Sequence, residues 1–396
     1  MALNKTSNLI IFYLLISLPF FFLIGSFFVN FITILISLYT FVWIVIYKKF
    51  NLIIKHSYIY FLPLFILFLV SSFFSDYKIT AFEESFSYLS HILFFISLPI
   101  LLLTDDKKKL LISKIVFFIV ILICIDLWFQ KFFHTNITGY TTQQAGRLTS
   151  FFKDEQIPGS IIFKMSPFVI YFLFFQKKNK IFSNYKFYII LFIYFSILIT
   201  GERAASLLST FLIIILTILN FKNINKKIFL YYLSFFIITF FILINSKNSV
   251  IKERILFTLN SQIHNNVYLS FYENSYSIFS NNILLGTGPQ SYRYVCPNNS
   301  YVNQDLNKSC STHPHNYFFE LLSDAGIFAP FLFIFSLFFI LRNKLKVIKN
   351  IFLKSLIIGY TILFFFPFIP TGSFFTSFHM TLTWFSLGFI FSLKKI

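Results

Sequence analysis

LIIFYLLISLPFFFLIGSFF, residues 9–28, is a continuous apolar run long enough to cross a bilayer as a helix. About 20 apolar residues span the roughly 30 Å hydrocarbon core of a membrane. The run is longer than the core of a signal peptide and no small-residue cleavage site follows it, so we expect it to be retained. Similar runs recur through a 396-residue chain that is 57% hydrophobic and 12% charged. A soluble domain averages about 25% charged residues, so the sequence predicts an integral membrane protein.

The fold class predicted from these runs is an all-α, polytopic membrane bundle. The runs are continuous and do not alternate with polar residues, which argues against a β-barrel. We predict about twelve transmembrane helices, at 8–28, 30–47, 58–75, 87–104, 110–129, 159–176, 187–201, 203–221, 228–245, 326–341, 351–369 and 378–393. The chain then divides into N-terminal helices (1–129), central helices with an outer loop (130–245), a large catalytic outer loop with short helices (246–325) and C-terminal helices (326–396).

Lysine-rich gaps between the runs alternate with gaps that hold almost no lysine. Because excess Lys and Arg marks the cytoplasmic side of a membrane protein, this alternation predicts cytoplasmic termini and outward-facing segments 130–158 and 246–325. The short gaps 28–30, 76–86 and 370–377 fall on the same outer side. The net charge of +19 follows this pattern, so it predicts topology and not a nucleic-acid partner.

Arginine is rare, with five residues against 28 lysines. Because lysine supplies most of the inner charge, arginine on the outer side indicates fork-shaped recognition of phosphate or carboxylate. The alternatives are arginines bound to lipid headgroups and, for Arg203, a local pair with Glu202. Four arginines lie on the predicted outer side: Arg147, Arg203, Arg254 and Arg293.

The stretch CSTHPHNYFFELLSDAG, residues 310–326, collects polar chemistry on the predicted outer side. Pro314 suits the first turn of a helix, the apolar residues after it recur at helical spacing, and Gly326 can end the helix. His315 at the start of this helix would stay neutral and could act as a base. The alternative is a structural histidine that caps the helix. His313 and His315 lack a third nearby ligand, so we predict no metal site.

Two further pairs of residues stand in the large outer loop. Cys296 and Cys310 face an oxidising compartment that allows a disulfide, which would close a loop of about 15 residues, contribute about 3 kcal/mol and tether the histidine segment. Two free thiols are the alternative. Gly286 and Gly288 form a lone Gly-x-Gly, which is a weak signal for phosphate binding and more often marks a turn.

Together these segments resemble the O-antigen ligase and O-antigen polymerase family of bacterial envelope glycosyltransferases. HPHNYFFELLSDAG (313–326) follows GTGP (286–289), and its His-Asn, nine residues and glycine are similar to the ligase signature, with Ala329 in the last small-residue place. RLTSFFKDEQIPGS (147–160) is similar to the family's outer Arg-x-x-Gly-x-Phe segment. TGERAA (200–205) is similar to its Thr-x-Ser-Arg-Gly-Ala segment.

The resemblance implies an activity and a set of site residues. Family members transfer a glycan from an undecaprenyl-diphosphate carrier to an acceptor hydroxyl on the periplasmic face of the bacterial inner membrane. The resemblance implies an inverting mechanism without a metal or other cofactor, with His315 as catalytic base and Arg147 and Arg203 as clamps on the diphosphate. It implies that the remaining substrate contacts come from Arg254, Arg293, Asn316, His313, Gly286 and Gly288.

The leading hypothesis is a ligase that transfers polysaccharide to lipid A–core, because the spacing after His315 matches the ligase signature. A polymerase that extends the carrier-linked glycan shares the same histidine and arginines. A flippase for lipid-linked glycans would need polar residues through the bundle, and the inner half of the predicted bundle is almost purely apolar. The expected partners are the carrier-linked donor, the acceptor glycan and membrane lipids.

Overall fold

The computed structural model describes residues 2–141, 147–153, 155–175, 180–220, 234, 267–298 and 310–393. Regular structure in these residues consists of fifteen α-helices, short 3-10 and π turns, and an isolated bridge between Thr135 and Thr141. The all-α prediction is therefore confirmed. The chain divides into two compact units.

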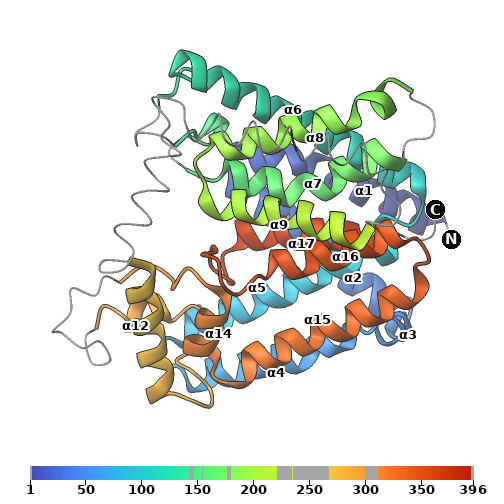
Figure 1. Ribbon diagram of the computed structural model, residues 1–396. Coiled ribbons are helices and arrows are strands. Elements are labelled where there is room, and N and C mark those ends of the chain that lie inside the picture. Colours follow the sequence, from blue (N-terminus) through green and yellow to red (C-terminus); the bar gives the residue numbers. More distant parts are fainter. Residues whose placement is uncertain are drawn as a thin grey trace. The chain divides into compact units, whose positions relative to one another are not determined.

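Unit 1 comprises Met1–Lys109, Val267–Lys349 and Phe364–Ile396. In it α5 packs against α2, α4 and α17, and α14 packs against α12 and α15. Figure 1 shows α4 and α15 side by side, with α12 and α14 at one of their ends and α3 at the other. The helices are α1 (Ala2–Ile24), α2 (Ser26–Ile46), α3 (Phe50–Lys55), α4 (Leu62–Phe74), α5 (Lys78–Ser97), α12 (Val267–Asn281), α13 (Tyr292–Val295), α14 (Tyr317–Ala325), α15 (Phe328–Val347) and α17 (Ser377–Ser392).

The core of unit 1 forms around α17. Almost every residue from Met380 to Ser392 is buried, as expected for a helix that is apolar on all sides. Trp384 is fully buried, and its ring lies 5.5 Å from that of Phe61, 5.3 Å from Phe95 and 5.7 Å from Phe365. These aromatic contacts connect α17 to α5 and to the turn before α4.

The outward-facing sides of several helices carry large apolar side chains. Phe27 is 72% exposed, Phe331 66% and Phe338 55%, which is the pattern of a surface in contact with lipid and not with water. Among the described residues, six helices are long and apolar enough to cross a membrane: Ser7–Ile24, Ser26–Ile46, Lys78–Leu102, Asp106–Phe133, Pro158–Phe175 and Phe328–Val347. Shorter apolar helices occupy Tyr58–Phe74, Tyr185–Ile199, Arg203–Leu219 and Ile351–Phe364. The protein is therefore a multi-pass membrane protein, and the predicted span at 228–245 lies, apart from Ser234, outside the described residues.

Two predicted boundaries differ from the structure. Hydropathy predicts a gap at 76–86, but α5 begins at Lys78 and includes Glu83 and Glu84. Charged side chains are compatible with a helix whose first turns lie at the end of the bundle, so hydropathy alone places its start too late. The span predicted at 351–369 ends at Phe364, because a proline three residues later cannot continue a helix.

Unit 2 comprises Leu110–Asn266 and Asn350–Leu363. Its helices α7, α8 and α9 pack on one another. Gly359 of α16 allows close packing on α9, since a Cβ atom there would lie 3.2 Å from Leu212 Cδ1. The helices are α6 (Asp106–Phe133, which begins in unit 1), α7 (Pro158–Phe175), α8 (Lys180–Ile199), α9 (Arg203–Asn220) and α16 (Ile351–Phe364).

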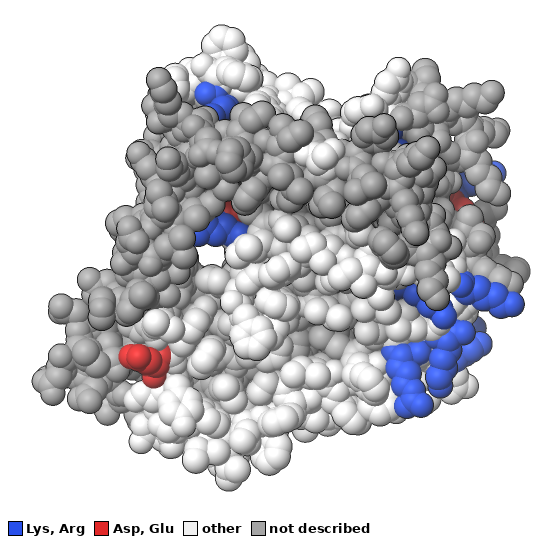
Figure 2. Space-filling model, in the orientation of Figure 1, with Lys and Arg blue, Asp and Glu red and all other residues white. Residues whose placement is uncertain are grey.

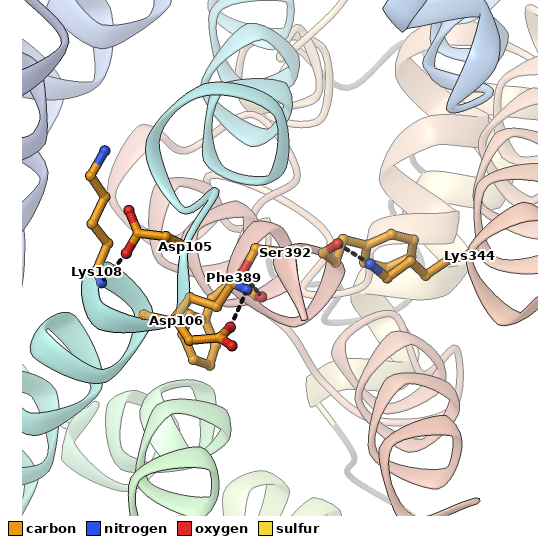
Figure 3. A network of polar contacts seen from close by, with 8 residues as sticks. Asp105, Asp106, Lys108, Lys344, Phe389 and Ser392 are labelled. Carbon is orange, nitrogen blue, oxygen red and sulfur yellow. Dashed lines mark hydrogen bonds and ion pairs between the residues drawn. The ribbon is translucent and has the colours of Figure 1, made fainter. Parts of the chain in front are cut away.

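One end of unit 1 is basic. Figure 2 shows Lys and Arg gathered at the end that holds α3. The exposed cations of α3, α15 and their flanks are Lys48, Lys49, Lys55, Arg342, Lys346 and Lys349. Figure 3 shows neighbouring polar contacts: Asp105 accepts from the main-chain N–H of Lys108 at 2.8 Å at the start of α6, and Lys344 donates to the carbonyl oxygen of Phe391. These cations belong to the gaps predicted to face the cytoplasm.

The opposite end of unit 1 brings together three segments that are far apart in the sequence. The Ser75 hydroxyl donates to the carbonyl oxygen of Thr287 at 2.7 Å. The ring of Tyr77 stacks on that of Tyr294 at 4.8 Å. The main-chain N–H of Thr371 donates to the carbonyl oxygen of His315 at 2.8 Å. The two short outer gaps and the large outer loop of the predicted topology therefore meet at the end that holds the histidines.

Candidate active site

The histidines lie in an irregular segment immediately before α14. The helix begins at Tyr317 and not at Pro314, because the Asn316 side chain accepts hydrogen bonds from the main-chain N–H groups of Phe318 (2.9 Å) and Phe319 (3.3 Å) and so caps the helix. The Asn316 amide also donates to the carbonyl oxygen of Pro367 at 2.6 Å. Asn316 is thus buried and its side chain holds the fold together, although the resemblance implied a substrate contact.

His315 sits in an aromatic pocket with an unusual main-chain conformation. Its φ is 55°, which non-glycine residues adopt rarely and mainly where the surroundings enforce it. The ring of His315 stacks on Phe271 at 5.4 Å, meets the edge of Tyr268 at 5.7 Å and lies 4.1 Å from the ring of His313. Its Nε2 atom lies 3.2 Å from the Ser311 hydroxyl. The imidazole is therefore held by contacts on several sides.

Both imidazoles are kept neutral. Burial lowers the pKa of His313 to about 3, and the nearby His315 and the charge of Arg293 act in the same direction. Burial also lowers the pKa of His315 below its ordinary value of 6.5. A backbone hydrogen bond with Thr371 opposes both shifts. Both rings are therefore neutral near pH 7, which is the protonation state that a general base requires, and the large shift makes His313 a weak base.

A buried carboxylate on α14 fixes the segment behind the histidines. Glu320 is 1% exposed, and it accepts hydrogen bonds from the Ser373 hydroxyl at 2.5 Å and the main-chain N–H of Phe374 at 2.6 Å. Burial raises the pKa of Glu320 to about 7, while these two bonds and the charge of Arg293 oppose that rise. Glu320 thereby ties α14 to the segment that carries Thr371.

Arg293 lies on α13 among several charged groups of unit 1. Its guanidinium interacts electrostatically with Glu84, Glu320 and His313. Arg293 and Glu84 are both half-buried. Within the described residues, Arg293 Nε and Glu84 Oε2 are buried without a hydrogen-bond partner. Arg293 is therefore a half-buried cation next to the histidines, a position that suits its predicted role as a substrate contact.

The Gly-x-Gly pair packs against the end of α14. Gly286 has φ +63°, and a Cβ atom there would lie 2.4 Å from the main-chain nitrogen of Ala325. Gly288 has φ +110°, and a Cβ atom there would lie 2.3 Å from the Ser75 hydroxyl. The N–H of Gly288 donates to the carbonyl oxygen of Asp324 at 2.8 Å. Both glycines are thus explained by conformation and close packing.

A disulfide joins Cys296, at the end of α13, to Cys310. Cys296 is fully buried, whereas Cys310 is exposed and stands immediately before Ser311. The bond therefore connects the helix that carries Arg293 to the segment that carries His313 and His315.

Unit 2 holds a second group of polar residues around Glu202. The Glu202 carboxylate accepts hydrogen bonds from the N–H groups of Gly159 (2.5 Å) and Ser160 (3.0 Å) and from the Ser160 hydroxyl (2.6 Å), at the start of α7. Burial raises the pKa of Glu202 to about 7, while these bonds and the charge of Arg147 oppose the rise. Arg147 donates to Gln156 Oε1, and its Nε atom is buried without a partner among the described residues.

Arg203 is the first residue of α9 and is exposed. Its side chain forms no hydrogen bond or ion pair within the described part of the chain. The local Glu202–Arg203 pair considered from the sequence is not formed, because the carboxylate of Glu202 turns to the start of α7. The guanidinium of Arg203 is therefore accessible to a ligand.

Comparison with known proteins identifies the family of this region. Residues 187–334 match the family model described as O-Antigen ligase. A search of the curated proteins found no match. Residues 187–334 are an O-antigen ligase family domain.

The O-antigen ligase domain contains Arg203, Arg293, His313 and His315, while Arg147 precedes it. Arg254 also falls within the matched range but lies outside the described residues. Sequence patterns did not point to Glu84, Glu320 or Thr371, which the structure places around the histidines. Acidic residues on amphipathic helices usually face water, so Glu84 and Glu320 did not stand out as site residues. The only feature that could have drawn attention to them was the scarcity of acidic residues, 14 in 396.

Proposed function

We propose that this protein is a glycosyltransferase that moves a glycan from undecaprenyl diphosphate to an acceptor hydroxyl on the periplasmic face of the inner membrane. The observation that carries the proposal is a neutral His315, held at positive φ in an aromatic pocket inside an O-antigen ligase domain. Strained conformations of this kind concentrate at functional sites. The imidazole has the protonation state of a base and a fixed orientation.

In the proposed reaction His315 accepts the proton of the acceptor hydroxyl. The hydroxyl oxygen attacks the anomeric carbon of the donor glycan as the bond from that carbon to the diphosphate oxygen breaks. Undecaprenyl diphosphate leaves with the bonding electron pair, and the configuration at the anomeric carbon inverts. The main-chain hydrogen bond from Thr371 to the His315 carbonyl, at 2.8 Å, supports the position of the base.

Arg147 and Arg203 are the proposed diphosphate contacts. A guanidinium presents two parallel N–H donors to phosphate oxygens, and fixed donors stabilise charge that grows on a leaving group. Arg203 is exposed and forms no ion pair within the described residues. Glu202 is occupied by the start of α7. The exposed guanidinium of Arg203 is therefore available to an anion.

The proposed activity is that of a ligase, with the polymerase as the second candidate. The ligase is favoured by the spacing of His315, Asn316 and Gly326. A strain that lacks the gene separates the two. Loss of a ligase leaves full-length polymer on the carrier and bare lipid A–core, whereas loss of a polymerase leaves lipid A–core with a single repeat unit. An unchanged glycolipid pattern would contradict both.

The pH dependence of transfer tests the role of the histidine. Because the pKa of His315 is lowered, the neutral base persists below pH 6.5, and activity is lost only as the pH falls through the lowered value. The acid limb of kcat/KM, measured with purified protein in proteoliposomes, is therefore expected below pH 6.5. An acid limb at or above that value would contradict a histidine base in this pocket.

A further inference from the structure

Four polar side-chain atoms beside the histidines are buried without a hydrogen-bond partner in the described residues: Glu84 Oε2, Arg293 Nε, His313 Nε2 and Thr371 Oγ1. Their segments meet. The ring of Tyr77, just before α5, stacks on Tyr294 of α13 at 4.8 Å, and the Cys296–Cys310 disulfide joins α13 to the histidine segment. The main-chain N–H of Thr371 donates to the carbonyl oxygen of His315 at 2.8 Å. Buried polar atoms are nearly always paired, so a group of unpaired ones calls for an explanation. Each of the four residues is partly exposed, so the group lies near the surface of unit 1 and not deep in its core.

The charges in this group favour a neutral ligand over an anion. The guanidinium of Arg293 interacts electrostatically with the acids Glu84 and Glu320, so protein groups already compensate part of its positive charge and leave less of it for a diphosphate. A hydroxyl group can donate to the Glu84 carboxylate and accept from the Arg293 guanidinium at the same time. The unpaired set contains both donors and acceptors, which is the complement of a sugar.

We propose that Glu84, together with Arg293 and His313, forms a subsite that binds hydroxyl groups of the acceptor glycan. The proposal rests on the proposed transferase function and adds to it a residue from the N-terminal helices, outside the matched domain. It also assigns Arg293 to the acceptor and not to the diphosphate. Glu84 is in this assignment a substrate-binding residue.

The test compares Glu84→Gln with Glu83→Gln in the purified full-length protein. Glu83 is the exposed neighbour of Glu84 on the same helix, so it controls for the loss of one negative charge at this place. The KM for lipid A–core acceptor and the KM for carrier-linked donor are measured separately. Glu84→Gln is expected to raise the acceptor KM about tenfold or more, the effect of weakening one hydrogen bond to a charged group, and to leave the donor KM within about twofold. Glu83→Gln is expected to change neither.

A binding measurement without reaction separates the subsite from the transferase activity. Saturation-transfer NMR with dephosphorylated core oligosaccharide is expected to detect binding to the wild-type protein and to the Glu83 variant, and to lose it with Glu84→Gln. Inorganic diphosphate is expected not to compete. If the oligosaccharide binds through Glu84 but the wild-type protein transfers no glycan, the proposed function fails while the subsite stands.

Four results would overturn the subsite while leaving the transferase intact. If the Glu84→Gln and Glu83→Gln variants have the same acceptor KM, the unpaired atoms are hydrogen-bonded to water alone. A rise in the donor KM instead of the acceptor KM, or competition by diphosphate, would assign the group to the anion. If Glu84→Gln and Glu84→Asp both fail to fold by thermal melting while Glu83→Gln folds, Glu84 is a structural residue.

Discussion

Replacement of His315 by alanine is expected to reduce glycan transfer by on the order of 10²–10⁴-fold, the usual contribution of a general base. The ring is neutral and lies beside Phe271 and Tyr268, and alanine leaves no group there that can accept the acceptor's proton. Arg203→Ala is expected to abolish transfer as well, because the exposed guanidinium is the proposed contact to the leaving diphosphate. In both variants the membrane helices keep their packing, so insertion is expected to be normal.

The measurement is complementation of the deletion strain, read as the glycolipid pattern on a gel, with the protein level quantified in isolated membranes. His134→Ala is the matched control, since His134 is exposed and also has a positive φ of 62° but is assigned no part in transfer. Wild-type glycolipid in the His315 and Arg203 variants would refute both assignments. Loss of protein from the membranes of the His315 variant would instead indicate a structural role for the ring.

Local patterns were sufficient to predict much of this molecule. Continuous apolar runs predicted an all-helical membrane protein, and His315 and Gly326 bracket a helix that the structure contains. The exact start of that helix was wrong because Asn316, rather than Pro314, determines it. Capping depends on the direction of one side chain, and spacing alone does not reveal that direction.

The surroundings of the histidines could not be predicted in the same way. Glu84, Glu320 and Thr371 reach the site from α5, α14 and the segment before α17, which are far apart in the sequence. A single sequence shows periodicity within a segment but not which distant segments pair. Of the sequence patterns, the distribution of lysine came closest to predicting which distant segments meet. It placed three outer segments on the same side of the membrane, and the structure brings those segments into contact.

The Gly-x-Gly pair was predicted to contact substrate, and its packing offers a second explanation for the motif. Gly286 and Gly288 lie against α14 and α4, and the N–H groups of the loop are used by carbonyl oxygens of the protein: Thr287 donates to Ser323 at 3.0 Å and Gly288 to Asp324 at 2.8 Å. A phosphate-binding loop would keep its N–H groups free for the ligand. The packing role is therefore the stronger explanation, and it makes a distinct prediction.

Gly286→Ala is expected to destabilise the protein strongly and to abolish activity. A left-handed conformation costs alanine about 1–2 kcal/mol, and the added Cβ, 2.4 Å from the main chain of α14, adds an overpacking cost of about 1–3 kcal/mol. Gly139→Ala is the matched control. Gly139 has φ +88°, but a Cβ atom added there would have none of the described residues within 4 Å. It therefore reports the conformational cost alone.

The two glycine variants are compared by thermal unfolding in one detergent and by the KM for the carrier-linked donor. If packing is the reason for Gly286, its variant melts well below the Gly139 variant, since α14 must move to admit the methyl group and the His315 segment moves with its cap. If Gly286 instead binds the diphosphate, the variant melts like the Gly139 variant while the donor KM rises. The difference in melting temperature thus decides between a loop that holds α14 in place and a loop that holds substrate.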